Sequence, residues 1–270
     1  MSRFLYITVC TAVLLFLLLP LLVIIPLSFS SGSYLTLTQE MIRFEPNAYS
    51  LKWYQEFFAS ETWHRAVANT MIVGISTTVL SSSLGTAAAI GLADNNLPLR
   101  GPILGVLVSP MIIPVVVTSA GLYFAFSTYG ITQSLLGLVL AHSVLAVPMV
   151  VLTVSATLVN FDRDLIKASH SLSASPVTTF WRVTLPLILP GVVSGAVFAF
   201  ATSLDEVVAT LFLAGVDQRT IPLQMWSGIR EQLSPTILAA ATMLTVLSIA
   251  LLFTVQSLKE RSAKRMHAAF

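Results

Sequence analysis

The sequence predicts an all-α membrane protein that crosses the bilayer six times. Only 10% of the 270 residues are charged and 56% are hydrophobic, and the mean hydropathy is +0.87. An average soluble domain carries about 25% charged residues, so a soluble fold could not cover this much apolar surface. The composition therefore excludes a soluble enzyme, a disordered chain and a nucleic-acid-binding domain. It predicts that lipid is the solvent of this protein.

Six stretches are apolar enough to span the membrane, because a span needs about 20 mostly apolar residues. They are residues 4–28, 66–93, 102–126, 134–159, 187–214 and 235–255. Each is expected to be helical, since backbone polar groups in lipid have to be satisfied within the segment.

The first stretch is expected to be a retained helix and not a signal peptide. Arg3 precedes it, as a basic residue precedes a signal peptide, but its apolar run is far longer than a typical signal-peptide core. Pro26, Leu27 and Phe29 lie where a small-residue cleavage site would fall.

The distribution of basic residues predicts the orientation. Six spans place both termini on one side of the membrane. Of the 14 Lys and Arg residues, nine then lie on the side of the termini and five on the other side, where the loops are much longer. Because basic residues are enriched in cytoplasmic loops, both termini are predicted to be cytoplasmic.

The largest outer loop, residues 29–65, is rich in aromatic residues. Within it Leu51–Phe58 is predicted to form a short amphipathic helix at the membrane interface. Two interpretations are open: the helix anchors the loop among lipid headgroups, or it belongs to a docking surface for an outer partner.

The inner loop between the fourth and fifth stretches, residues 161–186, is the longest on the predicted cytoplasmic side. A first short helix is expected to begin at Asp162 or Asp164, which are good N-cap residues. A second is expected to begin at Ser175 as N-cap, with Pro176 at the first helical position. The residues that recur at helical spacing are Leu165, Ala168 and Leu172 in the first helix, and Val177, Phe180, Trp181 and Thr184 in the second.

This loop resembles that of the binding-protein-dependent ABC importer permeases. Their pattern is Glu-Ala-Ala, three residues, Gly, nine residues, Ile-x-Leu-Pro. Here Lys167-Ala168-Ser169, Ser173 and the segment 183–186 keep that spacing. Lys167 replaces the Glu, Ser169 the second Ala and Ser173 the Gly. A Gly at that place permits a turn with positive φ, so Ser173 has to adopt the turn at a cost or bend the loop differently.

The resemblance implies a single permease domain over residues 1–270 with a type I ABC importer fold in a bacterial inner membrane. Residues 161–186 would be the coupling loop, which seats on a cytoplasmic dimer of ABC ATPases. The residues implied in that contact are Leu165, Lys167, Ala168, Ser169, Leu172, Ser173 and Pro176. Other implied partners are a second permease chain of different sequence, a periplasmic or extracellular solute-binding protein, and membrane lipid, with no nucleic acid.

The chain lacks the motif that cradles nucleotide phosphates, Gly-x-x-x-x-Gly-Lys-Ser/Thr. ATP is therefore expected to be bound by the partner ATPases, and this chain is expected to need no cofactor and to be no enzyme. No residue is predicted to be catalytic or to bind a metal. Two other classes remain as alternatives: a membrane-embedded enzyme and a self-sufficient secondary transporter.

Two acidic residues, Asp205 and Glu206, fall in the fifth apolar stretch. Ionisable groups inside a span are costly and are candidates for function. Either the span ends near Leu204 and the acids lie among outer headgroups, or they line a solute pathway, with Ser203 beside them. The run from Ser203 to Gly215 is similar to the spermidine/putrescine permease subfamily. This resemblance implies a polyamine or similar small cation, with an opine, an amino-acid derivative or a phosphonate as alternatives.

His142, in the fourth stretch, is expected to be a hydrogen-bonded structural residue, with a gate or proton site as the alternative.

Overall fold

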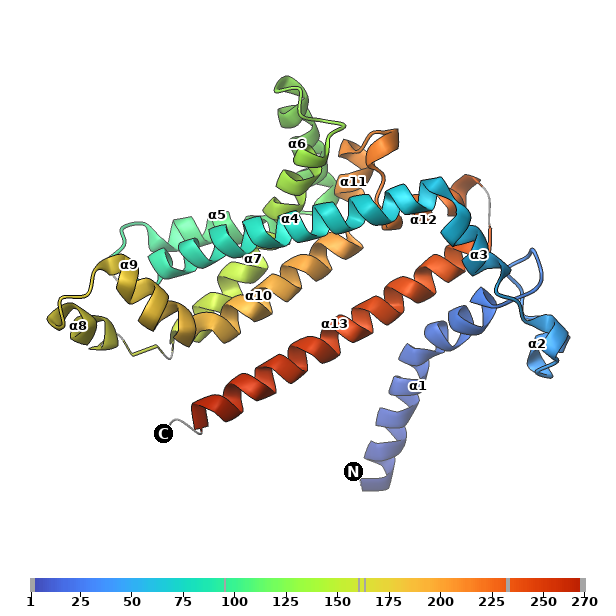
Figure 1. The fold of residues 1–270 in the computed structure, drawn as a ribbon, viewed down its shortest axis with the longest axis horizontal. Helices are drawn as coiled ribbons and strands as arrows, with labels where there is room; N and C mark the ends of the chain where they lie inside the picture. The colour runs from blue at the N-terminus through green and yellow to red at the C-terminus, as the bar shows by residue number, and fades with distance from the viewer. Residues whose placement is uncertain (1–2, 95, 160, 163, 232–233, 268–270) are drawn as a thin grey trace. The chain divides into compact units, whose positions relative to one another are not determined.

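The computed structural model describes residues 3–94, 96–159, 161–162, 164–231 and 234–267, and this part of the chain is helical apart from its loops and one isolated bridge between Ser30 and Tyr49 (Figure 1). The helices are α1 (Arg3–Ser28), α2 (Gln39–Ile42), α3 (Lys52–Ala59), α4 (Glu61–Leu92), α5 (Arg100–Ile112), α6 (Val115–Thr128), α7 (Leu135–Val159), α8 (Asp164–Ser171), α9 (Pro176–Thr179), α10 (Leu185–Asp205), α11 (Val208–Leu213), α12 (Ile221–Glu231) and α13 (Thr236–His267). Two 3-10 turns, η1 (Pro46–Ala48) and η3 (Val216–Gln218), and one π-helical turn, η2 (Phe180–Thr184), complete the order.

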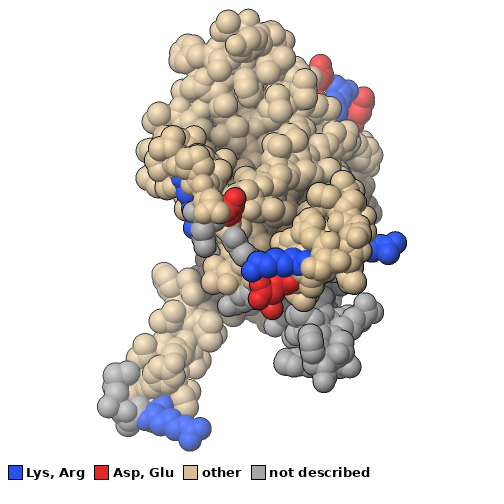
Figure 2. Space-filling view, turned by 90° about the vertical axis from the view of Figure 1, so that its left-hand side faces the viewer, with Lys and Arg blue, Asp and Glu red and all other residues tan. Residues whose placement is uncertain are grey.

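Five helices in the described residues are long and apolar enough to cross a membrane, and the pair α5 and α6 makes a sixth span if it is counted as one. The surface is correspondingly poor in charge: Figure 2 shows a face on which uncharged side chains cover most of the area. An apolar surface this extensive is stable only in lipid or under a partner. The predicted number of spans therefore agrees with the structure.

The third predicted stretch is not one helix. α5 and α6 meet at an angle of 106°. Ile113 adopts an extended conformation at the break, with φ −73° and ψ 133°, and Pro114 follows it. A proline disfavours the helical conformation in the residue before it, which accounts for the end of α5.

The fifth predicted stretch is also interrupted. α10 ends at Asp205, Glu206 is extended with φ −77° and ψ 111°, and α11 begins at Val208. We call residues Asp205–Val207 the acidic break. The expectation of one continuous helix through residues 187–214 was therefore wrong at the position of the two acids, and the alternative in which the helix ends near Leu204 agrees with the end of α10.

The chain divides into two compact units, which are described separately: unit 1 is Met1–Ala66 with Leu223–Ile249, and unit 2 is Val67–Pro222 with Ala250–Phe270. In unit 1, Leu27, Met41 and Ala48 form a small core. α3 matches the predicted interfacial helix to within about one residue at each end. Its Trp53 and Phe57 are buried, and the Trp53 indole N–H donates to the Ser30 carbonyl oxygen at 2.8 Å. These two rings hold the loop together and are not free to enter lipid.

Unit 2 is built around α7, along which α10 packs. The two helices approach closely because α10 carries small residues: a Cβ on Gly195 would lie 2.7 Å from Thr153 Oγ1 and 3.1 Å from Val150 Cα. The core around this contact comprises Ala146, Val150 and Val154 of α7, Ile188 and Ala199 of α10, and Ala89 of α4.

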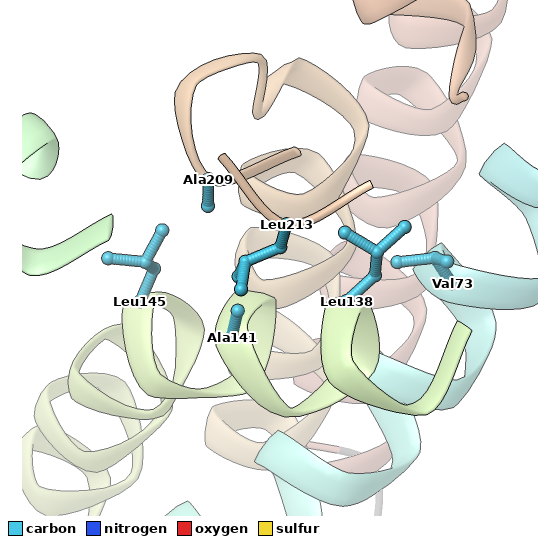
Figure 3. Packing of buried hydrophobic residues seen from close by; sticks show 6 residues of the cluster. All are labelled: Val73, Leu138, Ala141, Leu145, Ala209 and Leu213. Carbon is cyan, nitrogen blue, oxygen red and sulfur yellow. The ribbon is translucent and has the colours of Figure 1, made fainter. Parts of the chain in front are cut away.

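A second core in unit 2 joins α11 to α7 (Figure 3). Ala209 and Leu213 of α11 face Leu138, Ala141 and Leu145 of α7, and Val73 of α4 closes the cluster. Burying these aliphatic side chains stabilises the position of α11 in the unit by roughly 1.5–3 kcal/mol for each large one. The short helix after the acidic break is thus fixed by packing as well as by the chain.

Candidate functional site

The loop of residues 161–186, which we call the coupling loop after the role that the resemblance implies, forms the two helices that its caps predicted. The Asp162 carboxylate accepts a hydrogen bond of 2.9 Å from the Asp164 backbone N–H, and α8 begins at Asp164. The Ser175 hydroxyl accepts from the Thr178 N–H at 3.2 Å, and Pro176 occupies the first position of α9. Both helix starts are therefore local features that the sequence encodes directly.

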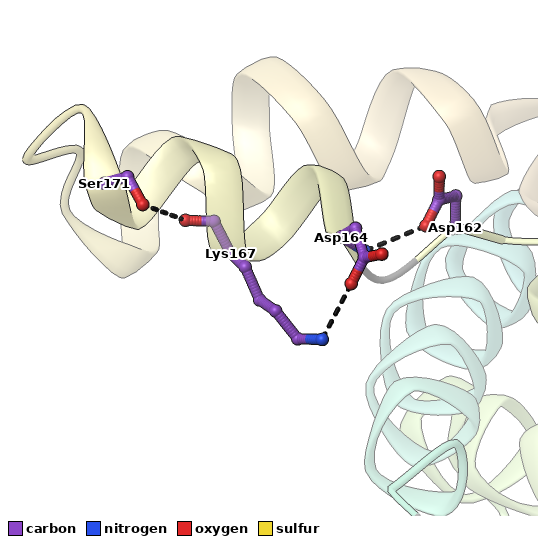
Figure 4. A network of polar contacts seen from close by, with 4 residues as sticks. All are labelled: Asp162, Asp164, Lys167 and Ser171. Carbon is purple, nitrogen blue, oxygen red and sulfur yellow. Dashed lines mark hydrogen bonds and ion pairs between the residues drawn. The ribbon is translucent and has the colours of Figure 1, made fainter.

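Lys167 is paired within α8 (Figure 4). Its Nζ lies 2.7 Å from Asp164 Oδ1, and the Ser171 hydroxyl donates to the Lys167 carbonyl oxygen at 3.1 Å. Both charged side chains are exposed. The hydrogen bond from Lys167 lowers the pKa of Asp164, and the same bond raises the pKa of Lys167. The positive charge that replaces the family's Glu thus has an acidic neighbour one turn earlier.

Ser173 adopts the left-handed conformation of the turn between α8 and α9, with φ +59°. The Ala174 N–H donates to the Ser169 carbonyl at 3.1 Å, and the Ser173 N–H donates to the His170 carbonyl at 2.9 Å. This pair of bonds is a Schellman motif, in which glycine is the usual residue at the position of Ser173. Of the two outcomes open from the sequence, Ser173 takes the turn at a conformational cost of about 1–2 kcal/mol.

A buried hydroxyl pair joins the two helices of the coupling loop. Ser169 Oγ lies 2.9 Å from Thr179 Oγ1, and both side chains are buried. The other six residues implied in the ATPase contact are exposed in this chain: Leu165, Lys167, Ala168, Leu172, Ser173 and Pro176. Ser169 therefore differs from the rest of the set, because its side chain faces α9 and is not available to a partner.

The coupling loop exposes four large apolar side chains among its polar ones. Leu172 is 83% exposed and Leu165 is 42% exposed. Val177 and Trp181, at 67% and 62%, are exposed as well and were not in the predicted contact set. Their helical spacing was visible in the sequence, but only the structure shows that they are exposed while Thr179 and Thr184 are buried.

The two carboxylates of the acidic break differ in burial and in hydrogen bonding. Glu206 is half-buried, and its Oε1 accepts a hydrogen bond of 2.7 Å from the Ala209 N–H, which caps the start of α11. Asp205 is exposed, and the described residues give its carboxylate no hydrogen bond or ion pair. Glu206 therefore stabilises the break, whereas the carboxylate of Asp205 is accessible from outside the chain.

Ser203 and His142 lie behind the break. Ser203 is buried, and its hydroxyl is 2.8 Å from His142 Nδ1, so it faces α7 and not an open surface. His142 Nε2 is 3.0 Å from the Thr210 hydroxyl of α11. The prediction that His142 is a hydrogen-bonded residue is confirmed. Within the described residues no group of His, Cys, Asp and Glu side chains could hold a metal ion.

Comparison with known proteins identifies the family. Residues 81–268 match the model of the binding-protein-dependent transport system inner membrane component. The chain belongs to this family of permeases. It is therefore a multi-pass inner-membrane permease of an ABC importer.

Individual relatives cover most of the permease. The spermidine/putrescine transport system permease protein PotC of Haemophilus influenzae is 30% identical, over 92% of this chain and 93% of its own. The molybdenum transport system permease protein ModB of Mycobacterium bovis is 35% identical over 64% of this chain and 71% of its own. A solved structure of a bacterial ABC transporter that imports the acidic polysaccharide alginate is 14% identical, covers 97% of this chain and 98% of its own, and has a TM-score of 0.72. The last likeness shows the fold.

Proposed function

We propose that this permease forms half of the pathway for a polyamine or a similar small cationic compound. The observation that carries this proposal is the acidic break, which ends the apolar span Pro176–Asp205 with one exposed and one half-buried carboxylate. No basic residue occurs between Gly191 and Val216 to neutralise them along the chain. A carboxylate at membrane depth is costly unless a cation or water compensates it, and a cationic solute would do so.

The identity to PotC supports a cation over the other solutes. ModB, the relative named for molybdenum transport, is more similar over a shorter part of the chain. An exposed, unneutralised acid in the pathway repels anions, so the chemistry of the break favours the polyamine-type assignment. An opine, an amino-acid derivative or a phosphonate would need a compensating basic group from a partner chain.

The partners follow from the same proposal. The exposed apolar side chains of the coupling loop suit a groove on a cytoplasmic ATPase dimer, with both termini of the permease in the cytoplasm. A second permease chain, different in sequence, would supply the other half of the pathway, and a solute-binding protein outside the membrane would deliver the solute. ATP would be bound by the ATPases, since the chain has no phosphate-cradling motif, and the permease itself would need no cofactor and catalyse no reaction.

A continuous helical arm supports a mechanical link between the two parts of the site. α9, η2 and α10 follow one another without a gap, so Pro176–Asp205 passes as one 30-residue span. One end of this arm is the second helix of the coupling loop, and the other is Asp205. The hydroxyl pair Ser169–Thr179 ties α8 to the same arm. A rigid-body movement of the loop would therefore be carried about 45 Å to the acidic break.

The test is transport by the complete assembly. The permease, its partner chains and the solute-binding protein are reconstituted in vesicles with ATP, and uptake of radiolabelled putrescine and spermidine is measured against molybdate as an anionic comparison. ATP-dependent uptake of the amines is expected. Uptake of the anion and none of either amine would contradict the proposal.

A further inference from the structure

A ring of hydrogen bonds crosses the acidic break and passes through α7. Ser203, at the end of α10, contacts His142 Nδ1 at 2.8 Å, and His142 Nε2 contacts the Thr210 hydroxyl at 3.0 Å. The Thr210 hydroxyl donates in turn to the backbone carbonyl oxygen of Glu206 at 3.1 Å. His142 and Thr210 are fully buried and Ser203 nearly so. The only side chain in this ring from outside α10 and α11 is the imidazole of His142.

One tautomer of the neutral imidazole satisfies all three contacts of the ring together. Thr210 uses its single hydroxyl proton on the Glu206 carbonyl, so its oxygen has to accept at the other contact. Nε2 of His142 therefore carries the proton and donates to Thr210. Nδ1 is then an acceptor, and the Ser203 hydroxyl donates to it. Every donor in the ring points along one direction, from Ser203 to the Glu206 carbonyl.

We propose that His142 is a positioning residue for the acidic break. As the Nε2–H tautomer it joins the end of α10 to α11 by hydrogen bonds, and these bonds set where Asp205 and Glu206 present their carboxylates. Glu206 is held by two hydrogen bonds. Its backbone carbonyl oxygen accepts from the Thr210 hydroxyl, and its carboxylate accepts from the Ala209 N–H. Asp205, two residues after Ser203, is left to meet the solute. This inference rests on the proposed function, in which the two acids line the pathway.

The neighbouring residue of α7 shows that burial of a polar group here does not by itself imply this role. Ser143 is also buried, but its hydroxyl donates to the Val139 carbonyl of its own helix at 2.7 Å. It makes no hydrogen bond to α10 or α11 in the described residues. Ser143→Ala is therefore a matched control, because it removes a buried polar group one residue away without opening the ring.

The geometry of the break can be measured without any solute. In the complete transporter, Cys10, the single cysteine of the chain, is replaced by Ser, Ala209→Cys is introduced at a fully buried position of α11, and the rate of labelling by N-ethylmaleimide is followed. His142→Leu is expected to change this rate by about tenfold, the effect of losing roughly one net hydrogen bond on a local opening equilibrium. His142→Gln, which keeps a donor and an acceptor, is expected to leave the labelling rate within about twofold, as is Ser143→Ala.

Should His142→Leu fail to insert, Ser203→Ala and Thr210→Val each remove one hydrogen bond of the ring, and each is expected to change the labelling rate about threefold.

Uptake supplies the second measurement, in a chain that retains Ala209. His142→Leu is expected to raise the half-saturating putrescine concentration about tenfold at matched protein levels, with the maximal rate preserved within about twofold. A merely structural role would lower the protein level or the maximal rate alone. Unchanged labelling in the His142, Ser203 and Thr210 variants, or an equal change in Ser143→Ala, overturns the positioning role. Changed labelling combined with normal putrescine uptake by Asp205→Asn/Glu206→Gln upholds it and instead refutes the solute pathway.

Discussion

The two adjacent acids of the break differ in what surrounds them, although they are neighbours in sequence. Glu206 caps α11 through the Ala209 N–H, whereas the carboxylate of Asp205 is exposed. A side chain that already accepts a backbone hydrogen bond has less capacity to bind a solute cation. We therefore assign the larger part of solute contact to Asp205 and a structural part to Glu206.

This division predicts unequal single variants. Asp205→Asn is expected to slow amine uptake about tenfold or more, because a charge-assisted contact is worth roughly 1.5–3 kcal/mol. Glu206→Gln keeps an oxygen to cap α11 and is expected to have a smaller effect, while Glu206→Ala also removes the cap and destabilises α11 by about 1 kcal/mol. Uptake is measured in vesicles with matched protein levels and intact ATPase binding. Normal uptake in the Asp205→Asn/Glu206→Gln double variant would remove the acidic pathway.

Ser173 offers a second prediction at the scale of one residue. Ser173→Gly relieves the left-handed conformation and is expected to leave stability unchanged or to raise it by up to about 1 kcal/mol, because the gain is partly offset by the greater freedom of glycine in the unfolded chain. Ser171→Gly, two residues earlier and inside α8, is expected to lower stability by about 0.5–1 kcal/mol. The measurement is the thermal midpoint of the purified permease in detergent. A fall of equal size in both variants would contradict the conformational cost assigned to Ser173.

At the scale of helices, the coupling loop joins local and distant interactions. Its two helix starts follow from Asp162, Ser175 and Pro176, which act on their own neighbours, and they were predictable for that reason. The burial of Ser169 depends on Thr179, ten residues away across a turn. Without that contact the sequence pattern grouped Ser169 with the residues available to a partner.

The same distinction explains the two interrupted spans. The periodicity and composition of residues 102–126 and 187–214 indicate membrane helices, and both stretches are helical on each side of their breaks. Pro114 indicates the position of the first break. The angle of 106° between α5 and α6 is larger than the kink that a proline produces within a continuous helix. The second break carries no proline. It is stabilised by His142 of α7 and by the packing of Leu213, neither of which can be deduced from the local sequence.

The exposed apolar side chains of the coupling loop lead to a prediction about Leu172, the residue that follows α8. Leu172→Asp is expected to uncouple ATP hydrolysis from transport, because an unpaired carboxylate buried against the ATPase costs several kcal/mol. Leu99→Asp is the matched control, since Leu99 is 73% exposed but lies in the loop before α5. ATPase binding and amine uptake are measured for both. Normal transport by a correctly inserted Leu172→Asp permease would show that Leu172 does not seat on the ATPase.

In the proposed function the permease contributes a solute-facing break and a loop that moves with it, and its sequence lacks the phosphate-cradling motif. The arm Pro176–Asp205 can transmit a displacement and cannot generate one. A type I fold shared with a transporter of an acidic polysaccharide also means that the fold alone does not select the solute. Selection and energy therefore have to be supplied by specific residues and by partner chains.

The last prediction follows from that separation. The purified permease is expected to hydrolyse no ATP, because no stretch of its sequence can cradle the phosphates. Adding the partner ATPase is expected to produce hydrolysis, and the solute-binding protein loaded with putrescine is expected to stimulate it, whereas the same mixture with Leu172→Asp is expected to lose the stimulation and keep the basal rate. Phosphate release is measured with azide present to suppress contaminating ATPases. Azide-insensitive turnover that co-purifies with the permease alone would mean that the chain has a nucleotide site of its own, and the division of labour between permease and ATPase would have to be abandoned.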